Sequence, residues 1–322
     1  MSVLIYAEYA DGKFKKVALE LASYAKAVAD SMGTQVTAVT INAGDTAELG
    51  KYGVSKVVNV TNNQLANFNA RAYADVIQQA AQKEAAKLII LSSTTDSLYL
   101  APLVAVGLEA GMASNVVGLP STTTSFQVKR SAFSQKAFTI TEMTTAVKVL
   151  CISKNSFGLI ENNTTTVTED FSPNLNETNF AVNVESIEKA NGKVSIADAD
   201  IVVSGGRGLK GPENWHLLED LATTLGAATA CSKPVSDIGW RPHSEHVGQT
   251  GKPVASNLYI AIGISGAIQH IAGINASKVK VVINTDPEAP FFKVADYGIV
   301  GDALEIMPRL TQKLKEFKAQ NS

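Results

Sequence analysis

Short β-branched runs alternate with helical patterns along the first 112 residues, and this alternation restricts the fold more than any other feature. Strands are predicted at 2–7, 35–41, 56–60 and 88–91, and helices at 16–32, 71–86 and 97–112. Gly33 is placed to end the first long helix, and a short helix is expected to end at Gly53. Strands joined through helices become parallel by right-handed crossovers. The pattern therefore predicts a parallel sheet with helices on both faces.

The pattern changes after Thr123, where three β-rich segments follow one another without intervening helices. They lie within 126–153 and predict an antiparallel meander added to the sheet. The polar stretch 161–179 is expected to be a loop or linker, followed by a strand at 180–187. A boundary between Ile187 and Asp200 would then divide the chain into an N-terminal α/β domain (1–190) and a second α/β domain (191–322).

The second half repeats the alternation. Strands are predicted at 201–203, 227–231, 258–262, 278–284 and 297–300, with helices at 213–225, 266–274 and 303–318. The fold class is therefore α/β, with two doubly wound Rossmann-like domains, the first carrying the antiparallel meander. Ligands of such sheets lie across the carboxyl ends of the strands, where the glycine-containing turns of this half are found.

Composition excludes several function classes. The 322-residue chain is 45% hydrophobic and has a net charge of -2, so it can bury a core but offers no basic field for nucleic acid. No apolar run reaches the roughly 18–20 residues of a membrane helix. The start of the chain resembles neither a signal nor a transit peptide, which predicts a cytoplasmic protein without stable membrane insertion. The two cysteines, Cys151 and Cys231, lack metal-type spacing, and no metal site is predicted.

A glycine-rich turn follows the first strand of the second half. Gly206, Gly208 and Gly211 fit G-x-G-x-x-G, and Arg207 adds an anion donor to this loop. An NAD site would need an acidic residue after the next strand, where Lys233 stands instead. Two interpretations stay open: a ligand-binding turn, or a turn needed only for strand–helix packing.

Other polar clusters have ordinary explanations. The hydroxyls of 92–97 favour a helix N-cap over a phosphate site. His243 and His246 favour a solvated loop over a metal site. Trp215 and Trp240 are expected to be packing residues, and Cys231 is expected to be a small buried hydrophobic residue.

Several long phrases resemble the FAD-binding domain of the electron transfer flavoprotein alpha subunit family. They occur in family order across 201–302: VVSGGRGLK, VGQTGK, LYIAIGISGAIQH and VINTDPEAPFFKVADYGIVGD. The N-terminal half matches more loosely, through IYAEYADGK and GVSKV.

The resemblance implies a heterodimer with an electron transfer flavoprotein beta subunit, in which this chain provides most contacts to one FAD and the partner holds AMP or a second FAD. It implies an electron carrier rather than an enzyme. Electrons would pass from acyl-CoA dehydrogenases of fatty acid beta-oxidation, or other dehydrogenases, to a quinone oxidoreductase or similar acceptor. The alternatives are an electron-bifurcating, NADH-dependent flavoprotein subunit, an NAD-dependent oxidoreductase, and a regulatory nucleotide-binding module.

The resemblance also implies positions for the cofactor. Arg207 should approach the flavin or its pyrophosphate, and Thr250 should lie near flavin N5. His270, which could otherwise be an ordinary helix histidine, should face the flavin N1–C2 region. Asn284 and Asp302 should hold the adenosine end. The complete expected set is Arg207, Ser232, Lys233, Val247, Gly248, Gln249, Thr250, Gly251, Ser265, Gly266, Ala267, Ile268, Gln269, His270, Asn284, Asp302 and Ala303.

One position departs from the family pattern. Where Ser-Arg is common, this chain has Ser232-Lys233. Arginine stacks flat on a ring, whereas lysine is a compact and strongly hydrated charge. The substitution leads to the hypothesis of an altered flavin potential. The family further implies a swivelling second domain, with a hinge expected near Asn191–Lys193.

Overall fold

The structure is a computed structural model that describes residues 2–123, 125–133, 135–187, 195–196 and 198–321. Contacts divide the chain into two compact units. The first comprises Met1–Ala132 and Ala137–Glu188, and the second includes Lys189–Ser322. The expected boundary at 190/191 and the expected hinge at Asn191–Lys193 lie outside the described residues.

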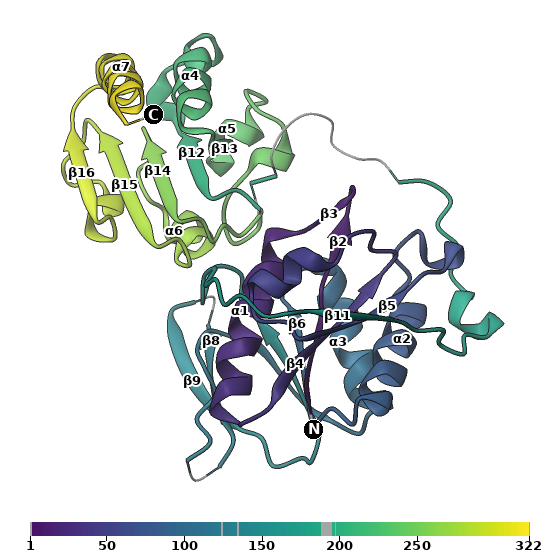
Figure 1. Ribbon diagram of the computed structural model, residues 1–322. Helices are drawn as coiled ribbons and strands as arrows, with labels where there is room; N and C mark the ends of the chain where they lie inside the picture. The colour runs from purple at the N-terminus through teal and green to yellow at the C-terminus, as the bar shows by residue number, and fades with distance from the viewer. Residues whose placement is uncertain (1, 124, 134, 188–194, 197, 322) are drawn as a thin grey trace. The chain divides into compact units, whose positions relative to one another are not determined.

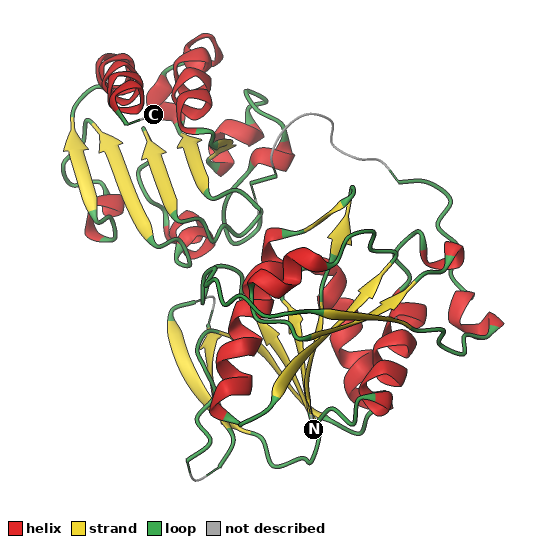
Figure 2. Ribbon diagram, viewed as in Figure 1, coloured by secondary structure: helices red, strands yellow, loops and turns green. Residues whose placement is uncertain are grey.

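The first unit is built on a nine-stranded mixed sheet of order β11-β5-β4-β1-β6-β10-β7-β8-β9. Its parallel strands are β1 (Ser2–Tyr6), β4 (Gln35–Ile41), β5 (Lys56–Val60), β6 (Leu88–Ser92), β7 (Gly111–Val116), β10 (Lys148–Ile152) and β11 (Val167–Asp170). The helices are α1 (Lys16–Ser31), α2 (Ala70–Lys83) and α3 (Thr95–Gly107), with 3-10 turns η1 (Ala47–Lys51), η2 (Asn63–Leu65) and η3 (Glu177–Phe180). A separate hairpin joins β2 (Tyr9–Ala10) and β3 (Lys13–Phe14). The predicted parallel sheet is confirmed (Figures 1 and 2).

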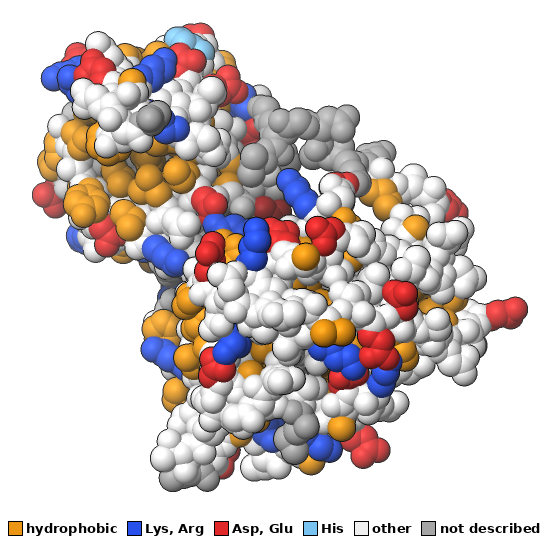
Figure 3. Space-filling model, viewed as in Figure 1, with side chains coloured by type: hydrophobic (Ala, Val, Ile, Leu, Met, Phe, Trp, Pro, Cys, Tyr) orange, Lys and Arg blue, Asp and Glu red, His pale blue; other side chains and the backbone are white. Residues whose placement is uncertain are grey.

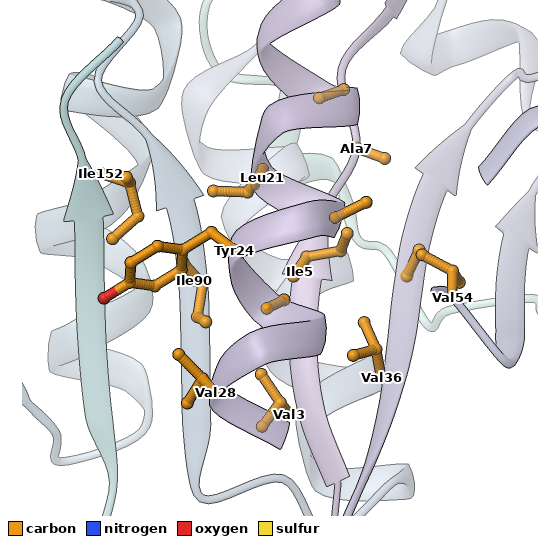
Figure 4. Close-up of a cluster of buried hydrophobic side chains, with 14 of the residues drawn as sticks. Val3, Ile5, Ala7, Leu21, Tyr24, Val28, Val36, Val54, Ile90 and Ile152 are labelled. Atoms are coloured by element: carbon orange, nitrogen blue, oxygen red, sulfur yellow. The ribbon is translucent and has the colours of Figure 1, made fainter. Parts of the chain in front are cut away.

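Helices cover both faces of this sheet. Successive strand residues point to opposite faces, so Val3 and Ile5 belong to one hydrophobic cluster and Leu4 and Tyr6 to the other. In Figure 4 the side chains of α1 lie against the first of these clusters, with Tyr24 between the helix and the strands. Helices α2 and α3 cover the second cluster.

The helix expected to run to Met112 ends earlier. Helix α3 ends at Gly107, and Glu109 takes a left-handed conformation with φ of 50°. Gly111 and Met112 instead begin β7, which the sequence prediction missed. The Ala110 N–H donates to the Ala105 carbonyl and closes the helix one residue after the left-handed position.

The expected meander within 126–153 is correct for two of its three segments. Strands β8 (Gln127–Ala132) and β9 (Ala137–Glu142) form an antiparallel hairpin at the sheet edge. The third segment, β10, instead inserts between β6 and β7 and is parallel to both. Its last four residues are all buried, as expected for a central parallel strand covered on two faces.

Two further predictions in this unit were wrong. The stretch expected to be a loop contains β11, which pairs with β5 at the edge of the sheet. It was missed because an edge strand that exposes most of its side chains has no hydrophobic pattern. The strand expected at 180–187 is absent from 181–187, which follow η3 without regular structure.

The second unit has a five-stranded parallel sheet of order β13-β12-β14-β15-β16. The strands are β12 (Ile201–Gly205), β13 (Ala228–Cys231), β14 (Leu258–Ile262), β15 (Val279–Asn284) and β16 (Tyr297–Val300), close to the predicted ranges. The chain passes from β12 to β13 on one side and then to β14 on the other. The direction of winding therefore reverses between β12 and β14, which makes their carboxyl ends the switch point where doubly wound folds bind ligands.

Helices again cover both faces. Helices α4 (Trp215–Leu225) and α7 (Ala303–Gln320) pack together on one face, over a cluster that includes Leu218 and Met307. The short helices α5 (Lys233–Asp237) and α6 (Ile268–Ile274) and the turns η4 (Arg207–Leu209), η5 (Pro212–Asn214), η6 (His243–Glu245) and η7 (Pro290–Lys293) complete the unit. All four residues of the edge strand β16 are exposed, and Figure 3 shows hydrophobic side chains gathered over this end of the sheet.

None of the helices among the described residues combines the length and hydrophobicity needed to cross a membrane. Within the same residues, no three His, Cys, Asp or Glu side chains are grouped to hold a metal ion.

Candidate functional site

A cavity of about 590 Å³ lies at the carboxyl ends of the second sheet, within the size range of small-molecule sites. Loops from four neighbouring strands supply its walls: Arg207 and Gly208 follow β12, Ser232 follows β13, Ser265 follows β14, and Asn284 ends β15. The rest of the lining is Lys233, Pro234, Asp237, His246, Val247, Gly248, Gln249, Thr250, Gly263, Ile264, Ala267, Gln269 and His270. The cavity is therefore centred on the switch point between β12 and β14.

Backbone hydrogen bonds hold the two turns at the switch point together. The Gly206 N–H donates to the Ile262 carbonyl (2.8 Å), and the Gly208 N–H donates to the Gly263 carbonyl (3.1 Å). The Gly263 carbonyl oxygen lies 2.1 Å from the place of a Cβ on Gly206, so no side chain fits there. The geometry of the glycine-rich turn is therefore compatible with both a packing role and a ligand-binding role, because the turn packs closely and also lines the cavity.

Helix α6 fixes the VGQTG turn in the same way. The Gln249 N–H donates to the Gln269 carbonyl (2.8 Å), and the Gly248 Cα would lie 2.6 Å from a Cβ on Gly273. This contact leaves Gln249 and Thr250 exposed at the cavity. The turn therefore presents amide and hydroxyl groups on a fixed backbone.

The cations at the cavity differ in their pairing. No carboxylate in the described part of the chain forms an ion pair with Arg207, whose side chain is exposed. Lys233 pairs with Asp237 at 2.9 Å, and this pair is exposed and weak. Arg207 is consequently the cation most available to an anionic ligand.

His270 lies deep in the cavity wall. A hydrogen bond of 2.8 Å joins its Nε2 to the Tyr259 hydroxyl, while its Nδ1 is buried without a partner in the described residues. Burial, reinforced by His246, lowers the pKa of His270 to about 4, and the Val247 backbone opposes this shift only in part. The ring is therefore neutral at pH 7 and can hold a hydrogen bond to a ligand.

The structure brings most of the predicted residues together. Arg207, Ser232, Lys233, Val247, Gly248, Gln249, Thr250, Ser265, Ala267, Gln269, His270 and Asn284 line the cavity. Five predicted residues do not line it: Gly251, Gly266, Ile268, Asp302 and Ala303. Asp302 caps α7 by accepting from the Leu304 N–H and pairs with Lys210 at 2.7 Å, and Ala303 is buried in the core. Their contacts with a cofactor stay predictions.

The expectation of a solvated loop around His246 was wrong. His246 is buried and lines the cavity, whereas His243 is exposed. The Arg241 guanidinium forms two 2.8 Å hydrogen bonds to Glu245, neutralising that buried carboxylate. This pairing lets a loop that is polar in sequence pack inward, a result that hydropathy alone could not indicate.

The ordinary explanations of the other residues are confirmed. Trp215 is buried under the Arg241 guanidinium, and the partly buried Trp240 packs on the same hydrophobic cluster. Burial raises the pKa of the Cys231 thiol to about 12, which leaves it protonated and unreactive. In the first unit, Thr94 caps α3 by accepting from the Ser97 N–H, as expected of the 92–97 hydroxyls.

Comparison with known proteins gives two family matches. Residues 3–178 match the electron transfer flavoprotein domain, and residues 195–275 match the electron transfer flavoprotein FAD-binding domain. An electron transfer flavoprotein subunit alpha from Thermoanaerobacterium thermosaccharolyticum is 35% identical over 98% of both chains. The Bacillus subtilis subunit alpha is 34% identical over 98% of this chain and 97% of that protein. A mitochondrial subunit alpha from Dictyostelium discoideum is 50% identical over 45% of this chain and 40% of its own.

Proposed function

Because the chain belongs to the electron transfer flavoprotein alpha subunit family, we propose that its switch-point cavity holds FAD and that the chain carries electrons in a heterodimer with a beta subunit. In the part of the chain that the structure describes, Arg207 forms no ion pair and the Nδ1 of His270 has no hydrogen-bond partner. Both residues line one cavity, which supports this proposal. FAD would supply the redox chemistry. The protein would bind and orient it.

The residues present fit such a cofactor. Arg207 offers a bidentate donor to phosphate oxygens, and the neighbouring glycines let the backbone come close. Thr250 and Gln249 provide a hydroxyl and an amide at the cavity edge, and His270 provides a neutral imidazole in its wall. We propose that these groups orient the flavin, and that Ser232 and Lys233 flank its ring.

Removal of the Arg207 charge tests the site. The Arg207→Gln heterodimer is expected to bind FAD about 10- to 100-fold more weakly, since a hydrogen bond to a charged group contributes roughly 1.5–3 kcal/mol. Fluorescence titration of the cofactor-free protein measures this affinity, and Arg309→Gln on the exposed side of α7 is the control. A wild-type heterodimer that stays colourless after incubation with FAD would refute the proposed function.

The first unit offers a surface for the partner subunit. Tyr99, Leu103 and Val106 lie at i, i+4 and i+7 on α3 and form an exposed apolar stripe, with Val106 80% exposed. We propose that the beta subunit covers this stripe, so that the N-terminal domain faces the partner. Val106→Glu should then weaken heterodimer formation in analytical ultracentrifugation while leaving the circular dichroism spectrum unchanged. An equally stable heterodimer would contradict this assignment.

We further propose acyl-CoA or other dehydrogenases as electron donors, a quinone oxidoreductase as acceptor, and AMP in the partner subunit. Nucleotide extraction from the purified heterodimer should yield one FAD and one AMP. The bifurcating alternative would yield two FAD and would oxidise NADH when both electron acceptors are present. Stopped-flow reduction with a reduced dehydrogenase, compared with NADH, separates the two functions.

A further inference from the structure

His246 is a cavity residue that the sequence motifs do not assign. It forms a parallel bridge with Cys231, and the Val247 N–H donates to the Cys231 carbonyl, so the segment extends the β13 edge of the sheet. The ring lies beneath the VGQTG turn, where its Nδ1 is 2.9 Å from the place of a Cβ on Gly251. The residue is 2% exposed and lines the cavity. The His246 carbonyl oxygen lies even closer to the place of that Cβ, at 2.4 Å, so position 251 must be a glycine for the turn to lie over His246.

The ring of His246 is enclosed by the protein. Its Nδ1 is buried with no hydrogen-bond partner in the described part of the chain. An unmatched buried polar group costs stability that a bound partner can restore. A buried, partnerless ring nitrogen in the wall of an open cavity therefore points to a ligand.

Four ionisable groups face His246. The His243 ring centroid lies 5.2 Å away, and Lys233 and Asp237 on α5 and His270 on α6 act on the ring electrostatically. Burial lowers the pKa of His246. The neighbouring His243 and Lys233 lower this pKa further, and Asp237 opposes the shift. The ring is accordingly neutral near pH 7 before a ligand binds.

We propose that His246 is a cofactor-binding residue that takes up a proton from solvent when an anionic group of FAD enters the cavity. The inference rests on the proposed function and adds a proton to the binding equilibrium. The imidazole gains one proton and one positive charge, and no covalent bond of the cofactor changes. The resulting imidazolium donates from both ring nitrogens, which gives the buried Nδ1 the role of a donor.

The direction of the pH dependence follows from this charge change. In the empty cavity the pKa of His246 lies below 6.5, and a neighbouring anion raises it. Between the two values the free protein is unprotonated and the complex is protonated. Affinity for FAD should therefore rise as the pH falls through this window. Above the window, ionisation of His246 should no longer change the affinity.

Calorimetry of the cofactor-free heterodimer with FAD tests the proposal. Titrations at pH 6.5 in two buffers of different ionisation enthalpy give the number of protons taken up. The wild type should take up a measurable fraction of a proton, and His246→Gln should lose most of that fraction while still binding FAD. His216→Gln, on the exposed end of α4, should retain it.

A second measurement does not depend on the variant folding. The chain has four histidines, so NMR of histidine-labelled wild-type chain, paired with unlabelled partner, can follow each ring through a pH titration. The pKa of His246 should rise when FAD is added. Equal proton uptake in wild type and His246→Gln, or an unmoved His246 titration, would overturn the inference while leaving FAD binding established. Failure of the wild type to bind FAD would instead overturn the proposed function.

Discussion

Lys233 lines the cavity, and the carboxylate of Asp237 partly neutralises its positive charge. The two side chains pair at 2.9 Å and each is at least half exposed, so the ammonium is hydrated and loosely held. The sequence identified the departure from arginine, and the structure adds the competing carboxylate. The ammonium is therefore expected to stabilise a reduced flavin less than a stacked guanidinium would.

Lys233→Arg should consequently raise the flavin potential of the heterodimer. A planar cation over a ring contributes about 0.5–1 kcal/mol at an exposed site, or roughly 20–40 mV for one electron. Spectroelectrochemical titration of both reduction steps measures the shift, with Lys315→Arg on α7 as a matched control. Identical potentials for Lys233 and its arginine variant in both steps would refute the hypothesis.

Glu8 is a buried carboxylate at the switch point of the first sheet, where β1 and β6 end. It pairs with Lys15 at 2.8 Å and accepts hydrogen bonds from Ser92, Thr94 and Ser97. Burial alone would raise the pKa of Glu8, but Lys15 and the hydroxyl donors together hold it below its ordinary value. The carboxylate therefore remains charged inside the first unit and links β1 to the start of α3.

The depressed pKa makes the stability of the first unit pH-dependent. Its contribution is complete above the unfolded value near 4.5 and is lost as the pH falls through the lower folded value. Glu8→Gln should cost about 1–3 kcal/mol at pH 7 and should remove this acid sensitivity. Urea unfolding followed by far-UV circular dichroism tests both effects, and the exposed Glu48→Gln is the control. A variant as stable as wild type at pH 7 would contradict the assigned role.

At the scale of elements, the site depends on two turns that touch through glycines. Gly263 follows β14 with φ of 62°, and a Cβ there would lie 2.7 Å from the Gly208 Cα. The β12 turn and the β14 turn can therefore approach only without side chains. Gly226, which ends α4 with φ of 67°, would place a Cβ in open space.

These two glycines separate backbone strain from steric contact. Gly226→Ala should lower the free energy of unfolding by only about 1 kcal/mol, the cost of holding an alanine in the left-handed conformation. Gly263→Ala should cost more, because the two turns must also move apart, and it should weaken FAD binding at least tenfold. Denaturant unfolding and FAD titration of the two variants measure the difference. Equal losses of stability, with FAD affinity retained in both, would contradict the role of this contact.

At the scale of the molecule, we propose that residues 1–190 and 191–322 fold as separate domains. Both tryptophans, Trp215 and Trp240, lie in the second unit, so their fluorescence reports on that unit alone. Far-UV circular dichroism reports on both. The chain thus carries a built-in probe of the cofactor-binding half.

Bound FAD should stabilise the second domain more than the first. At a free concentration 100 times the dissociation constant, binding adds about 2.7 kcal/mol to the unfolding free energy of the domain that holds it. With FAD bound, the unfolding transition followed by tryptophan fluorescence should therefore have its midpoint at a higher urea concentration. The unfolding curve followed by circular dichroism should become biphasic. A single transition that shifts equally by both probes would show that the two units unfold together.

The sequence was most informative where local patterns repeat. Strands β4, β5, β14 and β16 were predicted at their observed bounds, because β-branched runs between turn residues have few alternatives. Pairing was less predictable. Nothing local distinguishes β10, which crosses to the middle of the sheet, from the hairpin strands before it, and β11 joins an edge through its backbone.

For the site, contiguous motifs such as VGQTG and SGAIQH marked most of the residues that line the cavity, because glycines and donors adjacent in sequence must share a turn. Only the tertiary structure placed Asp237 and His246 beside them, and only it showed Asp302 committed to Lys210 and the start of α7. The sequence alone determined the α/β class, the family and the main cavity turns, which depend on local pattern. Strand order, burial and charge pairing depend on residues distant in the chain, and folding decided them.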